Sequence, residues 1–487
     1  MLPYASFLQL DKNSKIPIYI QLSNGLIQKI RSGIIPKGTK LPGSRQMADI
    51  IGLHRKTVIA AYDELFAQNY TEIVPSKGTF VSSKLPDIKP VPIASHLTFQ
   101  NNESAFFMEE DQDLDSDVFI SKGQLEFNDG LPDIRLAPWN EIGRIYKSVI
   151  NNKFKRYQLS YRDVQGETQI RESLGKYLSE SRGLRLSKEN ILITRGSIMG
   201  LYLAVSVIIS RGDHVIVGDT NYRAIKLMFK KAGANIHDVK VDEEGISVSE
   251  IEELCKRKKI RAVFVTPHHH YPTTVTLSAE RRIKLLELAN AYDLAILEDD
   301  YDYDYHYDTH PILPLASADE TGRVIYVGSF CKVLAPSLRI GYAVAPANVI
   351  REMCKLRRII DRQGDSSLEM VLHEMLESGL MRRHLKKTQK EYHIRRDHLC
   401  KILSSEFENQ ISFKVPGGGM AIWVKFNPEV SLPNLSRYCA EKNVYLYNGK
   451  IFNSGNNFSN ATRMGFASLQ IPEQDKGLEV LKSYLKK

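Results

Sequence analysis

Residues Tyr326–Tyr342 read YVGSFCKVLAPSLRIGY and are the most informative stretch of this 487-residue chain. The apolar run Val324–Val327 predicts a strand, which is followed by Ser329, Lys332 and, seven positions further on, Arg339. The amine of a lysine can form a Schiff base with an aldehyde, and a hydroxyl and a guanidinium together can hold a phosphate. The stretch therefore predicts a site for pyridoxal 5′-phosphate (PLP), with Lys332 as the residue that forms the Schiff base.

Strand-like and helix-like segments alternate over the part of the chain that leads to this stretch. The apolar runs are Ile191–Thr194, Val215–Val217, Ala262–Thr266, Leu294–Glu298 and Val324–Val327. Ser278–Tyr292 is one of the helical segments between them. Such alternation predicts an α/β domain with a mainly parallel sheet and a site at the carboxyl ends of its strands. The last section, about 370–487, adds charged helices and the strand-like Met420–Phe426, which predicts a small C-terminal α+β subdomain.

The composition predicts more than one domain and no membrane segment. A chain of 487 residues is too long for one ordinary hydrophobic core. No apolar run reaches about 18 residues, and the N-terminus lacks the pattern of a signal peptide. The 5 cysteines are odd in number and lack CxxC spacing, so neither a disulfide framework nor a zinc site is expected. We therefore expect a cytoplasmic protein without a metal centre.

Charge is distributed unevenly along the chain, which carries a net +9. Residues 1–84 hold 11 Lys/Arg and 5 Asp/Glu, a net +6, whereas residues 85–125 hold 2 Lys/Arg and 8 Asp/Glu, a net −6. A small basic segment joined to a large body indicates a polyanionic partner for that segment. The segment 85–118 begins with several prolines and is interpreted as an extended linker. The expected division is a head (1–84), the linker (85–118) and a PLP-binding body (119–487).

The order of elements expected in the basic head is helix, helix–turn–helix and hairpin. Helical apolar spacing covers Pro17–Arg31, and two shorter helices are expected over Arg45–Ile51 and His54–Gln68. The β-prone segments Thr71–Val74 and Thr79–Ser82 flank a turn and predict a β-hairpin. This order is that of a winged helix-turn-helix domain, which binds double-stranded DNA.

The second short helix is expected to read the DNA, because its first turn is basic and polar. Ser44 is expected to cap the first short helix, Arg45–Ile51. The expected inner face of the reading helix is Val58, Tyr62, Leu65 and Phe66. The tip of the hairpin fits a wing that lies over the DNA backbone or the minor groove. The candidate DNA-binding residues are Ser44, Arg45, His54, Arg55, Lys56, Thr57, Lys77 and Gly78.

From Ile16 to Val81 the head resembles the GntR family of bacterial regulators. Leu-Pro-Gly-Ser-Arg, ending at Arg45, is close to the family's Leu-Pro-Ser-x-Arg pattern, and the hairpin ends in the family's Gly-Thr-Phe-Val. His54 replaces a serine of the turn, and Ser76 stands where the first glycine of the wing is usual. The resemblance implies binding to operator DNA, and the change at His54 concerns which sequence is bound.

The body resembles fold-type I aminotransferases over about residues 125–487. The segments that carry the resemblance are Tyr161–Gly166, Arg182–Leu184, Thr194–Ile198 and Glu298–Tyr301. With its head included, the chain is similar to the MocR/GabR subfamily of GntR regulators, in which a winged helix-turn-helix is fused to an aminotransferase-like domain. Tyr271 and Thr274 depart from the pattern, because aminotransferases have the asparagine and glycine of Asn-Pro-Thr-Gly there.

The cofactor phosphate is expected at the start of a helix. Gly196, Ser197 and Ile198 begin a helix directly after a strand, so backbone N–H groups and the helix dipole can hold a phosphate there. A carboxylate beside the pyridine nitrogen of PLP keeps that nitrogen protonated. The resemblance assigns this role to Asp299, with Asp300 as the alternative if the register shifts by one residue.

Further contacts with the cofactor and an effector are implied by the resemblance. Tyr301 is expected to hydrogen-bond O3′ of PLP, and Tyr222 to stack on its ring. Arg463 is expected to hold the carboxylate of an effector through its guanidinium. His269 is expected to line the cofactor pocket. The run His268–His270 is not expected to bind a metal, because consecutive side chains on an extended loop point apart.

The leading hypothesis is a PLP-binding transcriptional regulator that senses an amine or an amino acid. The alternative is a functional PLP-dependent aminotransferase with an appended DNA-binding head. A third interpretation is a sensor of PLP itself. The expected partners are double-stranded operator DNA, a small-molecule effector and a second copy of the chain, because fold-type I sites are usually completed by the partner subunit.

Overall fold

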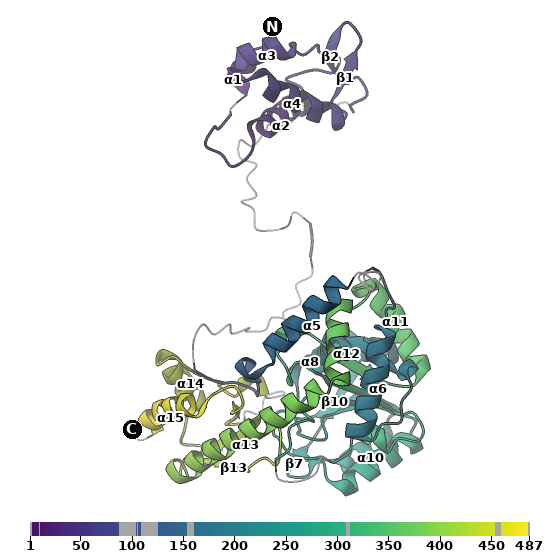
Figure 1. The fold of residues 1–487 in the computed structure, drawn as a ribbon, viewed down its shortest axis with the longest axis vertical. Coiled ribbons are helices and arrows are strands. Elements are labelled where there is room, and N and C mark those ends of the chain that lie inside the picture. The colour runs from purple at the N-terminus through teal and green to yellow at the C-terminus, as the bar shows by residue number, and fades with distance from the viewer. Residues whose placement is uncertain are drawn as a thin grey trace. The chain divides into compact units, whose positions relative to one another are not determined.

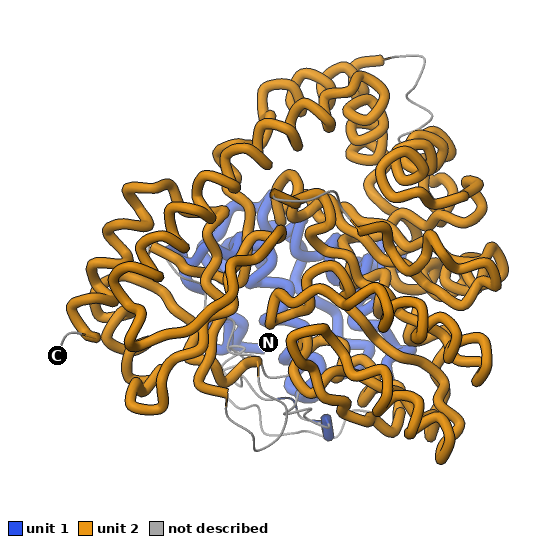
Figure 2. Tube along the Cα trace, turned by 90° about the horizontal axis from the view of Figure 1, so that it is seen from below, with its two compact units in different colours: residues 1–110 blue, residues 111–487 orange. Residues whose placement is uncertain are grey.

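The structure is a computed structural model that describes residues 2–8, 10–86, 104, 106–108, 125–152, 160–307, 312–452 and 459–485. It has two compact units, Met1–Glu110 and Asp111–Lys487, and each is described by itself (Figure 1, Figure 2). The segment expected to be a linker, 85–118, lies outside the described residues except for 85, 86, 104 and 106–108. No helix in the described parts of the chain is long and apolar enough to span a bilayer.

The first unit has the order of elements expected for a winged helix-turn-helix. Its elements are the helices α1 (Tyr4–Phe7), α2 (Ile18–Arg31), α3 (Ser44–Ile51) and α4 (Arg55–Ala67) and the antiparallel strands β1 (Thr71–Val74) and β2 (Gly78–Val81). One apolar core joins the three longer helices, with Leu22 and Leu26 of α2, Met47 of α3 and Leu65 of α4 fully buried. The sequence prediction of helix, helix–turn–helix and hairpin is therefore confirmed.

Three details of this unit differ from the sequence expectations. Ser44 is the first residue of α3 and caps no helix, since the glycine before it occupies the N-cap position. Phe66 is 51% exposed, because the helical period turns the position after buried Leu65 towards solvent. The short helix α1 was not expected, yet its Tyr4 is only 2% exposed and belongs to the core.

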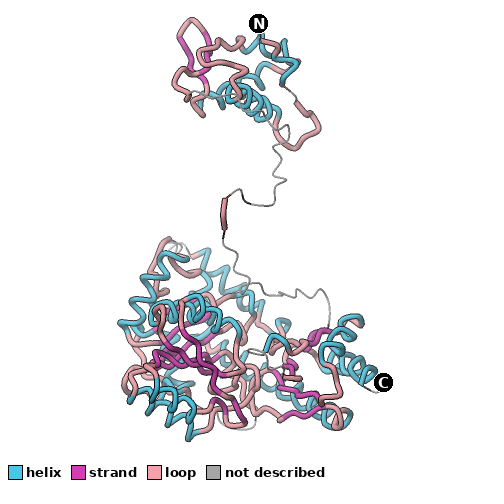
Figure 3. The backbone as a smooth tube through the Cα atoms, turned by 180° about the vertical axis from the view of Figure 1, so that it is seen from behind, coloured by secondary structure: helices cyan, strands magenta, loops and turns pink. Residues whose placement is uncertain are grey.

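The second unit is built on a seven-stranded sheet with the strand order β4-β12-β11-β10-β9-β5-β6. These strands are β4 (Ile191–Thr194), β12 (Gly341–Val344), β11 (Val324–Ser329), β10 (Ala295–Asp300), β9 (Ile260–Val265), β5 (His214–Gly218) and β6 (Asn235–Val239). Only β12 runs antiparallel to its neighbours, β4 and β11. The predicted mainly parallel sheet is therefore confirmed, and it is seen as the larger group of strands in Figure 3.

Helices and a small hairpin surround this sheet. They are α5 (Trp139–Asn151), α6 (Thr168–Arg182), α7 (Ser197–Ile208), α8 (Arg223–Lys231), β7 (Val241–Asp242), β8 (Gly245–Ile246), α9 (Val248–Arg257), α10 (Ala279–Ala291), α11 (Ala347–Ile360) and α12 (Ser366–Glu377). Alternating strand residues enter two different apolar cores: Val263 of β9 belongs to one, and its neighbour Phe264 to the other. Burial on both faces explains why these strands read as continuous apolar runs.

A smaller α+β subdomain completes the second unit, as the sequence predicts. Its elements are the long helix α13 (Leu380–Glu406), the antiparallel strands β13 (Ile411–Phe413), β14 (Ala421–Phe426) and β16 (Ala461–Gly465), the helices α14 (Leu432–Glu441) and α15 (Ile471–Leu485), and the parallel pair β15 (Val444–Leu446) and β3 (Leu125–Phe127). The strand β3 comes from the other end of the body sequence. Its Phe127 is fully buried in the core of the subdomain.

Candidate cofactor site and DNA-binding surface

A cavity of about 240 Å³ lies at the carboxyl ends of β10 and β11, where the sequence predicts the site. Its lining residues are Asp129, Leu131, Ser197, Ile198, Tyr222, Thr266, Tyr271, Asp299, Tyr301, Ser329, Cys331, Lys332, Pro336 and Arg339. They come from the turn after β3, the start of α7, the loops before α8 and after β9, the ends of β10 and β11, and the segments that directly follow these two strands. All the residues expected to bind the cofactor line this cavity except Gly196 and His269.

Lys332 lies directly beyond β11, with its amine held at the cavity. The side-chain Nζ donates a hydrogen bond of 2.8 Å to the carbonyl oxygen of Gly130. Ser329, the last residue of β11, accepts a hydrogen bond of 3.1 Å from the backbone N–H of Cys331 at its Oγ. This bond shapes the turn that carries the lysine away from the strand end.

The two neighbouring aspartates at the end of β10 have different surroundings. Asp299 lines the cavity, and no hydrogen-bond partner of its Oδ1 is found among the described residues although the atom is buried. Burial, and then the charges of Asp300 and Asp302, raise the pKa of Asp299 to about 8, against the opposing effect of Lys332. Asp300 does not line the cavity and accepts a hydrogen bond of 2.6 Å from the hydroxyl of Tyr326. The structure thus presents Asp299, not Asp300, to the cavity.

The start of α7 forms one end of the cavity. Gly196 is the N-cap residue and has φ +78°, so it adopts a backbone conformation that favours glycine. Ser197 and Ile198 follow it and line the cavity, where the first N–H groups of a helix have no partner within the helix. The guanidinium of Arg339 lies against Gly196, since a Cβ added there would approach it to 3.1 Å, and it donates a 3.0 Å hydrogen bond to the carbonyl of Arg195. This arrangement suits an anion.

Three tyrosine rings form much of the cavity wall. Tyr222 and Tyr271 meet edge to face, with ring centroids 5.3 Å apart, and Tyr271 also lies 6.2 Å from the ring of Tyr301. The hydroxyl of Tyr301 donates a hydrogen bond of 2.9 Å to the carbonyl of His269. Thr274, three residues after Tyr271, has φ +62°, which explains why related sequences have glycine at that position.

The three consecutive histidines do not line the cavity, so the expectation for His269 is wrong as to its position. The Nδ1 of His269 lies 2.8 Å from Oδ1 of Asp302, and its ring packs against Gly418. His270 Nδ1 lies 2.9 Å from the hydroxyl of Thr273. The rings of His269 and His270 thus contact different partners. Within the described residues, no group of three His, Cys, Asp or Glu side chains could hold a metal ion.

Arg463, expected to hold an effector carboxylate, is a fully buried residue behind the cavity wall. It is 1% exposed and is not among the lining residues. Its Nε donates a 3.0 Å hydrogen bond to the carbonyl of Asp129, and one terminal nitrogen donates to the carbonyl of Pro272, also at 3.0 Å. The guanidinium lies over the ring of Tyr271, 4.9 Å from its centroid. The structure therefore brings Arg463 close to the cavity without exposing it there.

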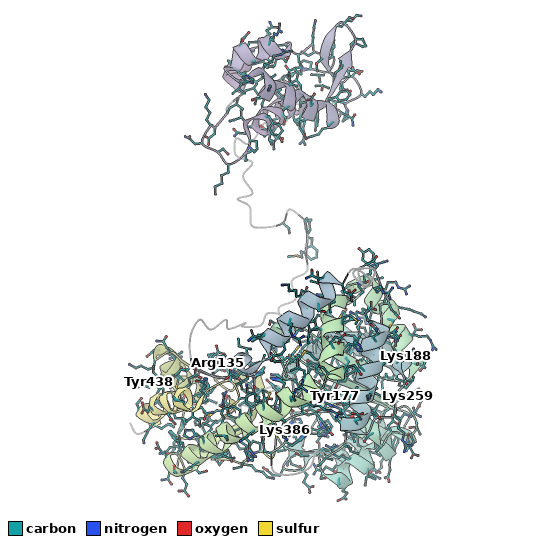
Figure 4. All side chains as sticks on the ribbon, in the orientation of Figure 1. Arg135, Tyr177, Lys188, Lys259, Lys386 and Tyr438 are labelled. Atoms are coloured by element: carbon teal, nitrogen blue, oxygen red, sulfur yellow. The ribbon has the colours of Figure 1, made fainter. Side chains whose placement is uncertain are left out.

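A network of buried polar groups supports the carboxyl end of β10 from behind. Arg182 of α6 forms an ion pair of 2.8 Å with Asp304 and a hydrogen bond of 2.9 Å with the hydroxyl of Tyr326. Tyr177, labelled in Figure 4, donates a hydrogen bond of 2.7 Å to Asp304 from the same helix. These contacts tie α6 to the segment that follows Asp299 and so hold that strand end in place.

Several cavity residues were not assigned from the sequence, and Asp129 is the most informative of them. The others are Leu131, Thr266, Tyr271, Cys331 and Pro336. Asp129 lies in Asn128-Asp129-Gly130, which reads as an ordinary turn after a short strand. The sequence does indicate a turn here, because an acidic residue next to a glycine favours one. In the structure Gly130 has positive φ, as such a turn requires. The sequence did not show that the turn lies beside Lys332.

The candidate DNA-binding residues of the head lie at the start of α4, at the start of α3 and in the turn between β1 and β2. His54 is the N-cap of α4, and its Nδ1 accepts a hydrogen bond of 3.2 Å from the backbone N–H of Lys56. Arg55 and Lys56 form the first turn and are exposed, and Thr57 beside them is half-buried. Arg55 Nε donates a hydrogen bond of 3.3 Å to Oγ of Ser44. Ser44 therefore positions the side chain of Arg55 and does not cap α3.

Arg45 of α3 and the hairpin turn complete this set. Arg45, Lys77 and Gly78 are exposed. The turn places Ser76 at φ +62° and Gly78 at φ +115°, both in the region that favours glycine. Ser76 therefore adopts a conformation that glycine takes more readily than serine.

Comparison with known proteins identifies both units. The profile of the family described as aminotransferase class I and II matches residues 147–481, and that of bacterial regulatory proteins, gntR family, matches residues 18–81. The kynurenine aminotransferase of Pyrococcus horikoshii, solved in complex with PMP, is similar in structure with a TM-score of 0.69 and 29% identity, covering 75% of this chain and 92% of its own.

Two relatives share the whole architecture. The uncharacterized HTH-type transcriptional regulator YdfD of Bacillus subtilis is 27% identical over 484 residues, which is 97% of each chain. The probable rhizopine catabolism regulatory protein MocR of Rhizobium meliloti is 26% identical over 424 residues, covering 86% of this chain and 84% of MocR. Fold and site thus define a winged helix-turn-helix joined to a fold-type I aminotransferase domain. The chain belongs to the aminotransferase class I and II family and, with its gntR-type head, to the MocR/GabR group of transcriptional regulators.

Proposed function

We propose that this protein is a PLP-binding transcriptional regulator whose aminotransferase-type domain senses an amine, an amino acid or PLP itself. The observation that carries the proposal is the presence of both parts in one chain. An exposed basic helix start is found in the head, and a cavity with a lysine amine and an unpaired carboxylate is found in the body. A metabolic aminotransferase has no need of the first part, whereas a regulator needs both.

The cavity residues fit PLP at each of its polar positions. The Lys332 amine suits the aldehyde, the unpaired Oδ1 of Asp299 suits the ring nitrogen, and the start of α7 with Arg339 suits the phosphate. The buried Asp299 atom is the sharpest sign of fit, because a buried carboxylate oxygen without a partner costs free energy unless a ligand completes it. When bound, PLP supplies an aldehyde that captures primary amines and a ring that withdraws electrons.

Each residue of the chain then has a defined task. Asp299 would hold a proton at the ring nitrogen, and the Tyr301 hydroxyl, which donates to the carbonyl of His269 in this structure, would turn to donate to O3′. The aromatic ring of Tyr222 stacks on the cofactor, while Ser329 and Arg339 bind phosphate oxygens with the first N–H groups of α7. Lys332, whose amine donates to the carbonyl of Gly130 in this structure, would hold the cofactor at its aldehyde carbon.

We also propose that the body forms a homodimer that carries two heads to paired DNA half-sites. Sites of this fold are usually completed by a second subunit, and two gntR-type heads joined to one dimer bind DNA with an effective concentration set by their tether. We propose that this dimer has two arrangements that differ in DNA affinity. An effector shifts the balance between them only by the difference in its own binding free energy for the two, typically about 1–3 kcal/mol.

The alternative, a functional aminotransferase, is favoured by one observation. Lys332 and Asp299 line the same cavity, as turnover requires. The buried position of Arg463, bonded to two backbone carbonyls, argues for the regulator, because efficient aminotransferases must exchange two carboxylate-bearing substrates. Steady-state turnover with a panel of amino donors and keto acids tests this alternative directly.

The proposed function is tested by selecting binding sites from a randomised duplex library with the full-length protein. The selected duplex is then titrated in fluorescence anisotropy with the cofactor-free and the PLP-loaded protein, and with primary amines added. We expect a selected sequence at least tenfold tighter than random duplex, and an affinity that changes with PLP or with an amine. The proposal would be contradicted if no sequence were enriched, or if neither PLP nor a primary amine changed the affinity for the selected duplex.

A further inference from the structure

The turn that follows β3 is held rigidly beside the cavity. Oδ1 of Asn128 accepts hydrogen bonds from the backbone N–H of Gly130 (3.0 Å) and of Leu131 (2.8 Å). Its Nδ2 donates to Oγ of Ser468 at 2.9 Å, and its carbonyl accepts from the N–H of Gly465 at 2.7 Å. Because the turn is bonded both internally and to the segment around β16, Asp129 projects from a fixed backbone.

The carboxylate of Asp129 faces the cavity without a partner of its own. Asp129 lines the cavity together with Lys332 and Asp299. Within the described part of the chain, no ion pair or hydrogen bond involves its carboxylate, and only its backbone carbonyl is engaged, by Arg463. Burial, and then the charges of Asp129 and Asp299, raise the pKa of Tyr222 to about 12, which places the Asp129 carboxylate within electrostatic reach of that ring.

The positive groups near Asp129 make their hydrogen bonds with other atoms. Arg463 lies within electrostatic reach of the Asp129 carboxylate, since, against the effect of burial, that charge is among those that raise the pKa of the guanidinium. The guanidinium nevertheless donates its hydrogen bonds to the carbonyls of Asp129 and Pro272, and Arg463 is 1% exposed. Arg339 lies against Gly196 at the start of α7, the expected phosphate position. Lys332 is bonded to the carbonyl of Gly130 and is the residue expected to join the cofactor.

A cation would complement the charge of the Asp129 carboxylate, which lines the cavity and has no ion-pair partner among the described residues. We propose that the effector is a primary amine carrying a second positively charged group, such as a diamine or a basic amino acid, and that Asp129 binds this second group. This inference rests on the proposed function, in which the first amine is captured at the Lys332 site.

Two pairs of amines that differ only in the distal group test the inference. They are 1,5-diaminopentane against pentylamine, and lysine against norleucine. Each is titrated into the PLP-loaded full-length protein, and its affinity is obtained from the change in the absorbance of the bound cofactor. We expect the member of each pair with the second ammonium group to bind at least tenfold more tightly, which equals about 1.4 kcal/mol.

Asp129→Asn should remove this preference by weakening 1,5-diaminopentane and lysine about tenfold while leaving pentylamine and norleucine unchanged. Unchanged binding of pentylamine and norleucine also shows that the variant retains its cavity. Glu126→Gln is the matched control, because Glu126 lies on β3 three residues earlier and does not line the cavity, and it should leave the preference intact.

Equal affinities within each pair for the wild type would overturn the inference, and so would equal losses of both partners in Asp129→Asn. In those cases the amine-sensing function itself still stands, because the absorbance has responded to amines. If no amine changes either the absorbance or the affinity for the selected DNA, both the inference and the amine-sensing function fail.

Discussion

The side-chain amine of Lys332 donates a hydrogen bond of 2.8 Å to the backbone carbonyl of Gly130. Lys332 follows β11 of the large sheet, whereas Gly130 belongs to the turn after β3, a strand that pairs with β15 of the small subdomain. The lysine expected to join the cofactor is therefore bonded across to the small subdomain. A change in the chemical state of its amine breaks or forms a contact between the two parts of the body.

Incubation of the protein with PLP should give a yellow product in which borohydride fixes the cofactor to Lys332. The amine lies in the cavity with the unpaired carboxylate of Asp299, so no other lysine has equivalent surroundings among the described residues. Peptide mass spectrometry after reduction checks the position. Lys332→Ala should carry no fixed cofactor, and finding the adduct on another lysine would overturn the assignment.

Gly196→Ala should weaken PLP binding at least tenfold, which equals about 1.4 kcal/mol. Gly196 has φ +78° and ψ 172°, a conformation almost restricted to glycine, and an added Cβ would approach Arg339 to 3.1 Å. Gly212→Ala is the matched control, because Gly212 also has positive φ, +90°, but has no atom within 4 Å of an added Cβ.

Both glycine variants should lose about 1–3 kcal/mol of stability from backbone strain, measured by urea unfolding. Only Gly196→Ala should lose affinity for PLP, measured by absorbance titration. Similar PLP affinities for the two variants would show that the start of α7 does not hold the phosphate.

Asp299→Asn should change the pH dependence of the stability of the cofactor-free protein. Burial, then Asp300 and Asp302, raise the pKa of Asp299 from 3.8 to about 8. Between these values the folded protein keeps a proton that the unfolded chain has lost. The free energy of unfolding contributed by Asp299 is therefore full below about pH 4 and is lost as the pH rises to about 8.

The measurement is urea unfolding of wild type and variant between about pH 5 and 7, where one such group contributes about 1.4 kcal/mol per pH unit at most. The stability of the wild type relative to Asp299→Asn should fall by about 1 kcal/mol per pH unit as the pH rises. Parallel curves for the two proteins would mean that Asp299 is ionised in the folded protein throughout this range.

Arg55→Ala in the head should cost about 1–3 kcal/mol of affinity for the selected DNA, concentrated at one base pair. Arg55 is exposed on the first turn of α4 and is positioned by Ser44. Lys77→Ala, at the hairpin tip, should instead weaken binding similarly on every sequence and reduce the salt dependence. Anisotropy titrations on selected and random duplexes check both, and equal losses on the two duplexes for Arg55→Ala would make it a phosphate contact.

Residues that follow apolar strands were the most predictable part of the site. The runs ending near Asp299 and Ser329 read as buried strands, and parallel strands present their carboxyl ends at one edge, so Asp299 and Lys332 could be placed together. The positions of His269 and Arg463 were less predictable. Their burial depends on Asp302, Tyr271 and backbone carbonyls, which only the tertiary fold brings near them.

Asp129 shows the limit of the sequence most clearly. It reads as a turn residue, and its position beside Lys332 arises because β3 pairs with β15, at the opposite end of the body sequence. In the head, the helix-turn-helix order was predictable from helical spacing and turn residues. The burial of Tyr4 was not, because a single short turn of helix carries no periodic signal.

The central claim is that the state of the Lys332 site controls DNA binding by the head. The most direct measurement is the affinity of the full-length protein for its selected duplex, with and without a saturating primary amine, for the PLP-loaded and for the cofactor-free wild type. We expect the amine to change the affinity of the PLP-loaded protein by about 5- to 150-fold, and that of the cofactor-free protein not at all. An identical response of the two forms to the amine would contradict the claim.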